Sequence, residues 1–226
     1  MVHQLIAKET EWNRVSKELK TEQLKLVSYD NTLIPLIGKI KLKKMLDYGG
    51  GPGVLSLALK KLGADVKEYD LSDDMRNQAA QKIGKKNIYN TIEKIPQNYF
   101  DIVICNLVLC IVSEEEVKRI LKNIKQLLNA HGFAYIGFCN PKLLNVPETQ
   151  LDLRPAPKHK YTENHSYIKT KKEGGYQIIE NHRPIKWYEK MYKDTGLKLV
   201  DTIYTPKYEF KERKIKDFII FKLKKI

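Results

Sequence analysis

The sequence lacks the features of a disulfide-stapled, membrane-spanning or fully disordered protein. It holds three cysteines in 226 residues, Cys105, Cys110 and Cys139, an odd number with no CxxC pair, which excludes a disulfide framework. The longest apolar stretch, 102–112, contains Asn106 and is too short to cross a bilayer. Hydrophobic residues still make up 42% of the chain, enough to bury a core, so wholesale disorder is excluded as well.

The first residues, MVHQLIAKETEW, carry no apolar run of signal-peptide length before charged residues begin. We therefore expect a soluble, cytoplasmic protein that does not associate with membranes. The sequence leaves the oligomeric state open.

Arginine is scarce in a chain that is otherwise strongly basic. The net charge is +14, yet only six of the 41 basic residues are arginine. Arginine is the side chain preferred for bidentate recognition of phosphates and bases, so the lysine excess favours a solvated surface over nucleic-acid binding. Basic residues are densest in segments 154–172 and 207–226. Steering of an anionic substrate, or contact with RNA, therefore remains an alternative.

Strand and helix patterns alternate five times along the middle of the chain. Such a rhythm predicts βαβ units, and hence a parallel sheet with helices on both faces. The segment 100–106, FDIVICN, does not alternate and is typical of a strand buried on both faces. The expected strands are 41–47, 64–70, 87–92, 100–106 and 133–139, and the expected helices are 54–62, 73–83 and 114–128.

The rhythm breaks after Cys139, where segment 140–183 holds four prolines and no helical periodicity. A hairpin is expected near its end, with the turn at 173–175, and the segment is expected to lie over the ligand edge of the sheet. A helix should begin at Pro184, followed by strands at 197–204 and 216–223. The expected organisation is thus a single domain over 1–226, with an N-terminal helical cover at 1–40, a core at 41–139, the insertion at 140–183 and a final helix and strands at 184–226.

The clearest functional signal is the run Asp47-Tyr48-Gly49-Gly50-Gly51-Pro52-Gly53 at the end of the first expected strand. Glycines there let a ligand lie against the backbone, and the open N–H groups of the following helix favour negative charge. The spacing D-x-G-x-G-x-G is neither the dinucleotide fingerprint G-x-G-x-x-G nor a P-loop, which needs a Lys-Ser/Thr pair.

Asp70 closes the next expected strand, where a carboxylate can accept hydrogen bonds from both hydroxyls of a ribose. Leu71 and Met75 follow it and could flank a purine ring. Together, the glycine loop and the carboxylate predict a nucleoside ligand across the tips of the first two strands.

At these residues, the chain resembles the class I S-adenosylmethionine-dependent methyltransferases, over about 42–139. The resemblance implies a Rossmann-like, mostly parallel seven-stranded α/β sheet with helices on both faces and an antiparallel last strand. It also implies S-adenosylmethionine as cofactor, with core 41–139 as the part that binds it. By the family pattern, the cofactor-binding residues are Tyr29 as a cover, Asp47, Gly49, Gly51 and Gly53 near the methionine part, Asp70 at the ribose, Leu71, Met75, Thr91 and Ile92 at the adenine, and Asn106 and Leu107 near the sulfonium.

The methyl acceptor is expected to be a small molecule. Asn106 is not followed by the Pro-Pro-Tyr of amino-methylating DNA enzymes, and no Pro-Cys suggests a cytosine-C5 enzyme. The stretch His182-Arg183-Pro184 resembles one that lies near the substrate cavity in small-molecule members. His182 is the candidate general base, although it could equally cap the helix or bind the backbone.

Two other functions stay open: an RNA or tRNA methyltransferase that uses the lysine-rich segments, and a non-catalytic binding module that keeps the cofactor fold. The histidines lack metal-ligand spacing, so no metal site is expected.

Overall fold

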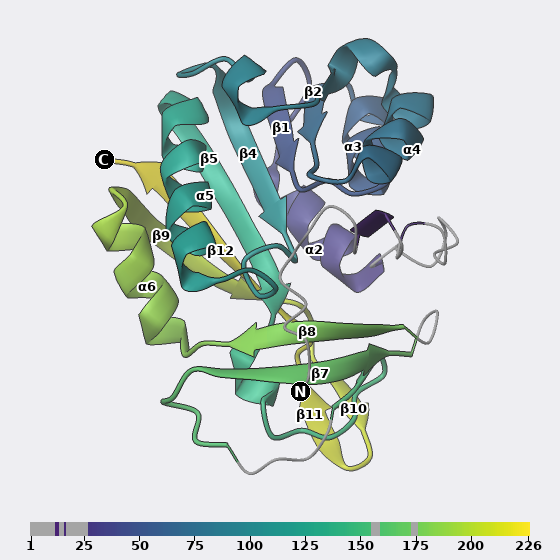
Figure 1. Cartoon of the computed structure of the whole chain (residues 1–226), viewed down its shortest axis with the longest axis vertical. Coiled ribbons are helices and arrows are strands. Elements are labelled where there is room, and N and C mark those ends of the chain that lie inside the picture. The colour runs from purple at the N-terminus through teal and green to yellow at the C-terminus, as the bar shows by residue number, and fades with distance from the viewer. Residues whose placement is uncertain (1–11, 14–15, 17–26, 155–158, 173–175) are drawn as a thin grey trace.

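The computed structural model describes residues 12–13, 16, 27–154, 159–172 and 176–226, and is built around one twisted sheet (Figure 1). The sheet has seven strands in the order β3-β2-β1-β4-β5-β12-β9. β12 runs antiparallel to both of its neighbours, and the other pairs are parallel. The strands are β1 (Lys44–Tyr48), β2 (Asp65–Tyr69), β3 (Ile88–Tyr89), β4 (Phe100–Asn106), β5 (Leu128–Cys139), β9 (Leu197–Tyr204) and β12 (Phe218–Lys225). The fold expected from the sequence is confirmed.

Helices cover both faces of the sheet, and each face has its own apolar core (Figure 1). On one face α5 (Glu114–Leu127) and α6 (Ile185–Asp194) bury their apolar sides against β4, β5 and β12. On the other face, α2 (Val27–Ile37) and α3 (Val54–Lys61) pack against the sheet, and α4 (Asp73–Ile83) lies beside α3. α5 begins where the sequence predicts, since the Ser113 Oγ accepts a hydrogen bond from the Glu116 N–H at 3.2 Å.

The insertion forms a small antiparallel sheet that lies across the carboxyl ends of the parallel strands (Figure 1). It consists of β6 (Asp152–Leu153), β7 (His165–Lys171) and β8 (Gln177–His182), preceded by the 3-10 turn η4 (Pro141–Leu143). The expected hairpin is β7–β8, in which the two strands pair from His165 opposite His182 to Thr170 opposite Gln177. The insertion therefore faces the edge of the sheet at which α/β proteins bind ligands.

Two segments differ clearly from the expected elements. The strand predicted at 87–92 is only β3, flanked by the 3-10 turns η2 (Lys85–Asn87) and η3 (Ile92–Lys94), because it lies at the sheet edge with one neighbour. β5 begins at Leu128, ahead of the strand expected at 133–139, and its register opposite Phe100 is irregular. A Cβ at Gly132 would lie 2.8 Å from the Phe100 carbonyl oxygen, so this crowded crossing requires a glycine.

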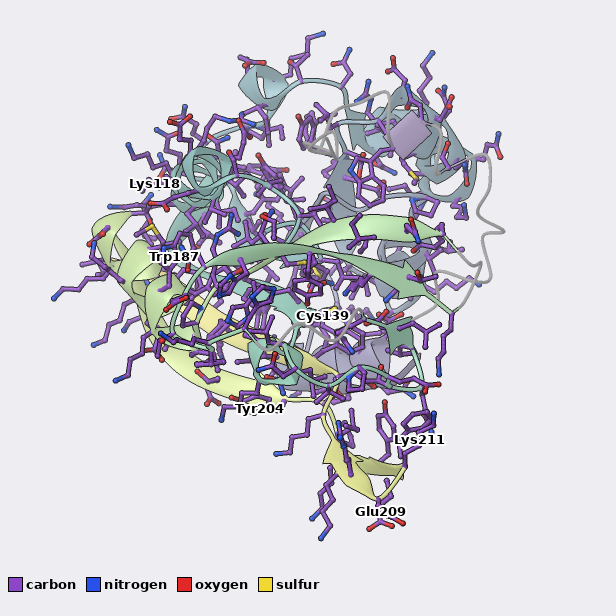
Figure 2. All side chains as sticks on the ribbon, turned by 60° about the horizontal axis from the view of Figure 1, so that its bottom comes forward. Lys118, Cys139, Trp187, Tyr204, Glu209 and Lys211 are labelled. Carbon is purple, nitrogen blue, oxygen red and sulfur yellow. The ribbon has the colours of Figure 1, made fainter. Side chains whose placement is uncertain are left out.

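A second hairpin, β10 (Tyr208–Phe210) and β11 (Arg213–Ile215), was not expected from the sequence. Its turn residues Lys211 and Glu212 adopt positive φ, which no glycine or asparagine signals in the sequence. Figure 2 shows this hairpin projecting from the body with Glu209 and Lys211 at its end, whereas Cys139 lies in the interior.

Most of the expected N-terminal cover lies outside the described residues. Its described parts are α2 and the three residues Trp12, Asn13 and Ser16. Asn13 and Ser16 contact the start of α4: the Asn13 Oδ1 accepts hydrogen bonds from the Ser72 hydroxyl and, at 3.3 Å, from the Asp74 N–H. In the part of the chain that the structure describes, no helix is both long and apolar enough to span a membrane.

Candidate active site

The glycine loop after β1 is held against the end of β2 by its own backbone. The Gly49 N–H donates to the Tyr69 carbonyl at 2.7 Å. Gly49, Gly51 and Gly53 all adopt positive φ, which side chains disfavour. At Gly53, the left-handed residue before α3, an added Cβ would lie 2.9 Å from the Ala79 Cα of α4, whereas no atom of the described residues lies within 4 Å of such a Cβ at Gly51. The loop is therefore packed tightly beneath and open above.

Asp70 lies at the tip of β2, where both of its carboxylate oxygens are held by the backbone. Oδ2 accepts a hydrogen bond from the Gly51 N–H at 3.0 Å, and Oδ1 accepts one from the Ser72 N–H at 2.9 Å. Burial raises the pKa of Asp70, and these hydrogen bonds oppose the rise. Each oxygen keeps a second lone pair, so the carboxylate can still accept hydrogen bonds from a ligand.

Two further carboxyl groups are buried under the loop. The Asp47 Oδ2 accepts a hydrogen bond from the Ser56 hydroxyl of α3 at 2.9 Å. Glu68, on β2, is fully buried, and among the described residues neither of its oxygens has a hydrogen-bond partner. Burial raises the pKa of both groups, and the Asp47 charge raises that of Glu68 further. This pair therefore favours holding protons at neutral pH.

Tyr29 and Asn106 join α2 to the end of β4. The buried Tyr29 hydroxyl donates to the Asn106 Oδ1. The approach is close because Gly137 leaves room: a Cβ there would lie 1.7 Å from the Tyr29 hydroxyl oxygen. Leu107 follows with a positive φ of 58°, and its N–H donates to the Gly137 carbonyl at 2.7 Å. A strained non-glycine residue at a strand tip is typical of a functional site.

These elements enclose a cavity of about 500 Å³. It lies between the tips of β1, β2 and β4 and the insertion. Nine of the sequence-predicted residues line it: Tyr29, Asp47, Gly49, Gly51, Asp70, Leu71, Met75, Asn106 and Leu107. Gly53 lies behind the loop, and Thr91 and Ile92, at the start of η3, lie away from the cavity lining. Most of the predicted set is thus brought together in one place.

His182 lies outside the cavity lining. It is buried at the end of β8, and its Nε2 lies 2.9 Å from the Tyr161 carbonyl oxygen. Its ring also contacts those of Tyr161 and His165. Burial lowers the pKa of His182, which favours the neutral imidazole. These contacts fit the structural reading of this histidine better than the reading as a base, which stays a prediction.

The insertion contributes charged side chains that the sequence did not single out. Lys169, Lys171 and Glu180 line the cavity opposite the glycine loop, and all three are buried. Lys169 and Lys171 alternate along β7, so both face the same side. That alternation is visible in the sequence, but alone it indicates a solvated, lysine-rich strand. The burial of this face depends on residues far away in the chain, such as Cys139, which Lys169 contacts.

Two aromatic residues from distant parts of the chain pack on the same residue of the cavity lining. Trp12 and Tyr176 both pack against Met75 of α4, and all three line the cavity. Leu71 also lines the cavity, and its side chain is 44% exposed.

The structure is thus a Rossmann-like α/β domain with a cavity at the tips of its parallel strands. Residues 46–136 match the family model described as the methyltransferase domain. A solved S-adenosylmethionine-dependent methyltransferase from Mesorhizobium loti superimposes with a TM-score of 0.64 at 16% identity, covering 85% of this chain and 95% of that one. The 1,6-didemethyltoxoflavin-N1-methyltransferase of Burkholderia thailandensis does so with a TM-score of 0.59 at 13% identity, covering 91% and 80%.

A curated relative, the ribosomal protein L11 methyltransferase of Lactobacillus johnsonii, is 28% identical over 166 residues, which is 70% of this chain and 46% of that protein. The chain thus spans less than half the length of the curated relative. Residues 46–136 thus match a methyltransferase domain, and the chain shares the fold of solved S-adenosylmethionine-dependent methyltransferases.

Proposed function

We propose that the chain methylates an oxygen or nitrogen atom of a small molecule, with S-adenosylmethionine as donor. The observation that carries the proposal is the cavity of about 500 Å³, which is bounded by the glycine loop on one side and by the insertion on the other. A space of this size holds a cofactor with a compact acceptor, and the insertion sheet covers the strand tips that a macromolecule would have to reach.

The cofactor is proposed to lie against the glycine loop. Support comes from the open space above Gly51 and from the Asp70 carboxylate with spare lone pairs for ribose hydroxyls. The exposed Leu71 side chain suits an adenine face. Two acidic side chains that line this half, Asp30 and Asp70, suit a cationic ligand. When bound, S-adenosylmethionine supplies a methyl group that its sulfonium charge has already activated.

The work of the chain is then positioning and exclusion of water. Asn106 and Leu107, fixed by Tyr29 and by the Gly137 carbonyl, would set the floor on which the acceptor approaches. The acceptor atom gains the methyl carbon and loses its proton, and S-adenosylhomocysteine is the coproduct. To act as the base that takes this proton, the His182 ring would have to enter the cavity, because it is not part of the cavity lining.

A protein acceptor is the second candidate, because the curated relative carries the name of a ribosomal protein methyltransferase. One set of assays separates the possibilities. S-adenosylhomocysteine binding is measured by calorimetry, and S-adenosylhomocysteine release is then followed with a small-molecule panel, with ribosomal protein L11 and with RNA. Turnover with the small molecules alone supports the proposal. Turnover with L11 or a steep salt dependence of RNA binding would replace it, and absence of S-adenosylhomocysteine binding would favour a non-catalytic module.

A further inference from the structure

The insertion places a buried charge network on the cavity wall opposite the glycine loop. Asp152 pairs with three cations: Lys171 at 2.6 Å, Arg154 at 2.9 Å and Lys169 at 3.4 Å. Glu180 pairs with Lys169 as well. Buried charges of this kind are costly unless they are paired, so each unused hydrogen-bonding group in the network is informative.

Two of the three network members that line the cavity already have two or more partners. The Lys169 ammonium contacts the Cys139 sulfur at 2.9 Å as well as Asp152 and Glu180, which uses its three N–H bonds. Glu180 accepts a hydrogen bond from the Tyr167 hydroxyl at 2.6 Å on one oxygen and pairs with Lys169 through the other.

Of these three side chains, Lys171 has the fewest partners. Within the described residues its ammonium has one partner, an oxygen of Asp152, and its side chain is 10% exposed. An ammonium has three N–H bonds, so two remain on a buried cation that lines the cavity. The unused N–H bonds of Lys171 are donors, so the ligand atoms that pair with them must be acceptors.

Charge balance specifies the kind of acceptor. The network holds three cations, Arg154, Lys169 and Lys171, and two carboxylates, Asp152 and Glu180. Of these five, Lys169, Lys171 and Glu180 line the cavity, whereas Arg154, Asp152 and a further buried carboxyl group, Asp217, lie outside its lining. The wall facing the cavity thus has an excess of positive charge, whereas the opposite half is acidic.

We propose that the methyl acceptor is a small carboxylic acid whose carboxylate binds the Lys171 ammonium. The assignment rests on the proposed function, since it names the acceptor class for that same cavity. A monoanion fits better than a phosphate dianion, because the Glu180 carboxylate lies on the same wall and repels a second negative charge. Opposite polarity of the two halves would orient the acid with its nucleophile toward the glycine loop, so that Lys171 acts as a specificity-determining residue.

Matched acid and amide probes test the assignment. Binding of benzoate and indole-3-acetate is compared with that of benzamide and indole-3-acetamide by calorimetry, with S-adenosylhomocysteine present, and phenyl phosphate serves as the dianion. We expect the acids to bind roughly tenfold or more tightly than their amides, which is the size of a hydrogen bond to a charged group. Lys171→Gln should abolish the preference. Lys172→Gln, whose parent lysine pairs with Glu148 at 2.6 Å outside the cavity lining, is the matched control and should keep it.

The outcomes separate this assignment from the proposed function. If S-adenosylhomocysteine binds but acids and amides bind equally, or none of the probes binds, the carboxylic-acid assignment is overturned while the cofactor site stands. Tighter binding of phenyl phosphate than of benzoate overturns it too, as does an acid preference that persists in Lys171→Gln. Unaltered S-adenosylhomocysteine binding by both variants shows that they are folded. Failure of the wild-type protein to bind S-adenosylhomocysteine overturns the proposed function as well.

Discussion

The Asp70 carboxylate accepts a hydrogen bond from the Gly51 N–H at 3.0 Å, and this bond ties the tip of β2 to the loop that follows β1. The same side chain thus fixes the loop and, in the proposed function, binds the ribose. Because its second oxygen is held by the Ser72 N–H, the carboxylate cannot rotate freely. Its spare lone pairs are directed by the backbone before any ligand arrives, which reduces the ordering cost of binding.

Asp70→Asn should lower the affinity for S-adenosylhomocysteine roughly tenfold to a hundredfold. The substitution replaces one carboxylate oxygen, a hydrogen-bond acceptor, with an NH2 group, a donor that would face a backbone N–H. Calorimetry measures the effect. Asp65→Asn, at the exposed start of the same strand, is the control and should bind like the wild type. An unchanged affinity in Asp70→Asn would remove this residue from the cofactor site.

Glu68→Gln should make the protein more stable in alkaline buffer. The folded-state pKa of Glu68 is raised above that of the unfolded chain, so the folded state binds the proton more tightly. The contribution of this carboxyl group to the free energy of unfolding is present below the ordinary glutamate pKa, about 4.3. It is lost as the pH rises through the pKa of the folded state. A glutamine cannot ionise and avoids that loss, which we expect to be on the order of 2 kcal/mol.

Urea unfolding measures this prediction at a mildly acidic and a mildly alkaline pH. The gain of Glu68→Gln over the wild type should be larger at the alkaline pH. Glu115→Gln, an exposed position on α5, serves as the control and should show no such difference. Equal gains at both pH values would show that the Glu68 carboxyl titrates alike in the folded and unfolded chains.

His182→Gln separates the two readings of this histidine. Its contact with the Tyr161 carbonyl and its position outside the cavity lining predict a loss of stability with little change in turnover per folded molecule. Because burial lowers its pKa, the wild-type contribution to stability is present above the ordinary histidine pKa and is lost as the pH falls through the folded value. The pH profile of kcat, measured for both proteins, gives the answer. Disappearance of one ionisation from the profile of the variant would instead establish His182 as the base.

The half of the cavity formed by the glycine loop and Asp70 could be predicted from the sequence because its signals are local. Asp47 and the glycines follow a buried strand, Asp70 follows the next, and parallel strands end at one edge, so their proximity follows from topology alone. The element bounds at Asp73–Ile83 and Phe100–Asn106 were also predicted to the residue, since a serine cap marks the first and a continuous apolar run the second.

The half of the cavity formed by the insertion could not be predicted in the same way. Lys169, Lys171 and Glu180 have the alternation of a solvated strand face, and their burial depends on where the insertion folds over the sheet. Position of an insertion is set by contacts between residues far apart in the chain, such as the Asn181 N–H donating to the Cys110 carbonyl at 2.6 Å. No spacing within either segment encodes that contact.

Trp12→Ala should weaken S-adenosylhomocysteine binding roughly tenfold, mainly through faster dissociation. Trp12 and Tyr176 pack on Met75, and all three residues line the cavity. Removal of one ring would therefore expose this part of the cavity to water and remove apolar contact area. Stopped-flow displacement measures the dissociation rate. Phe210→Ala, on the projecting β10–β11 hairpin, removes an aromatic ring away from the cavity and should leave that rate unchanged.

Tyr176→Ala should add less to the Trp12→Ala variant than it does to the wild type, because the two rings share their contact with Met75. Fully additive effects would mean that the N-terminal segment and the insertion cover the cofactor independently.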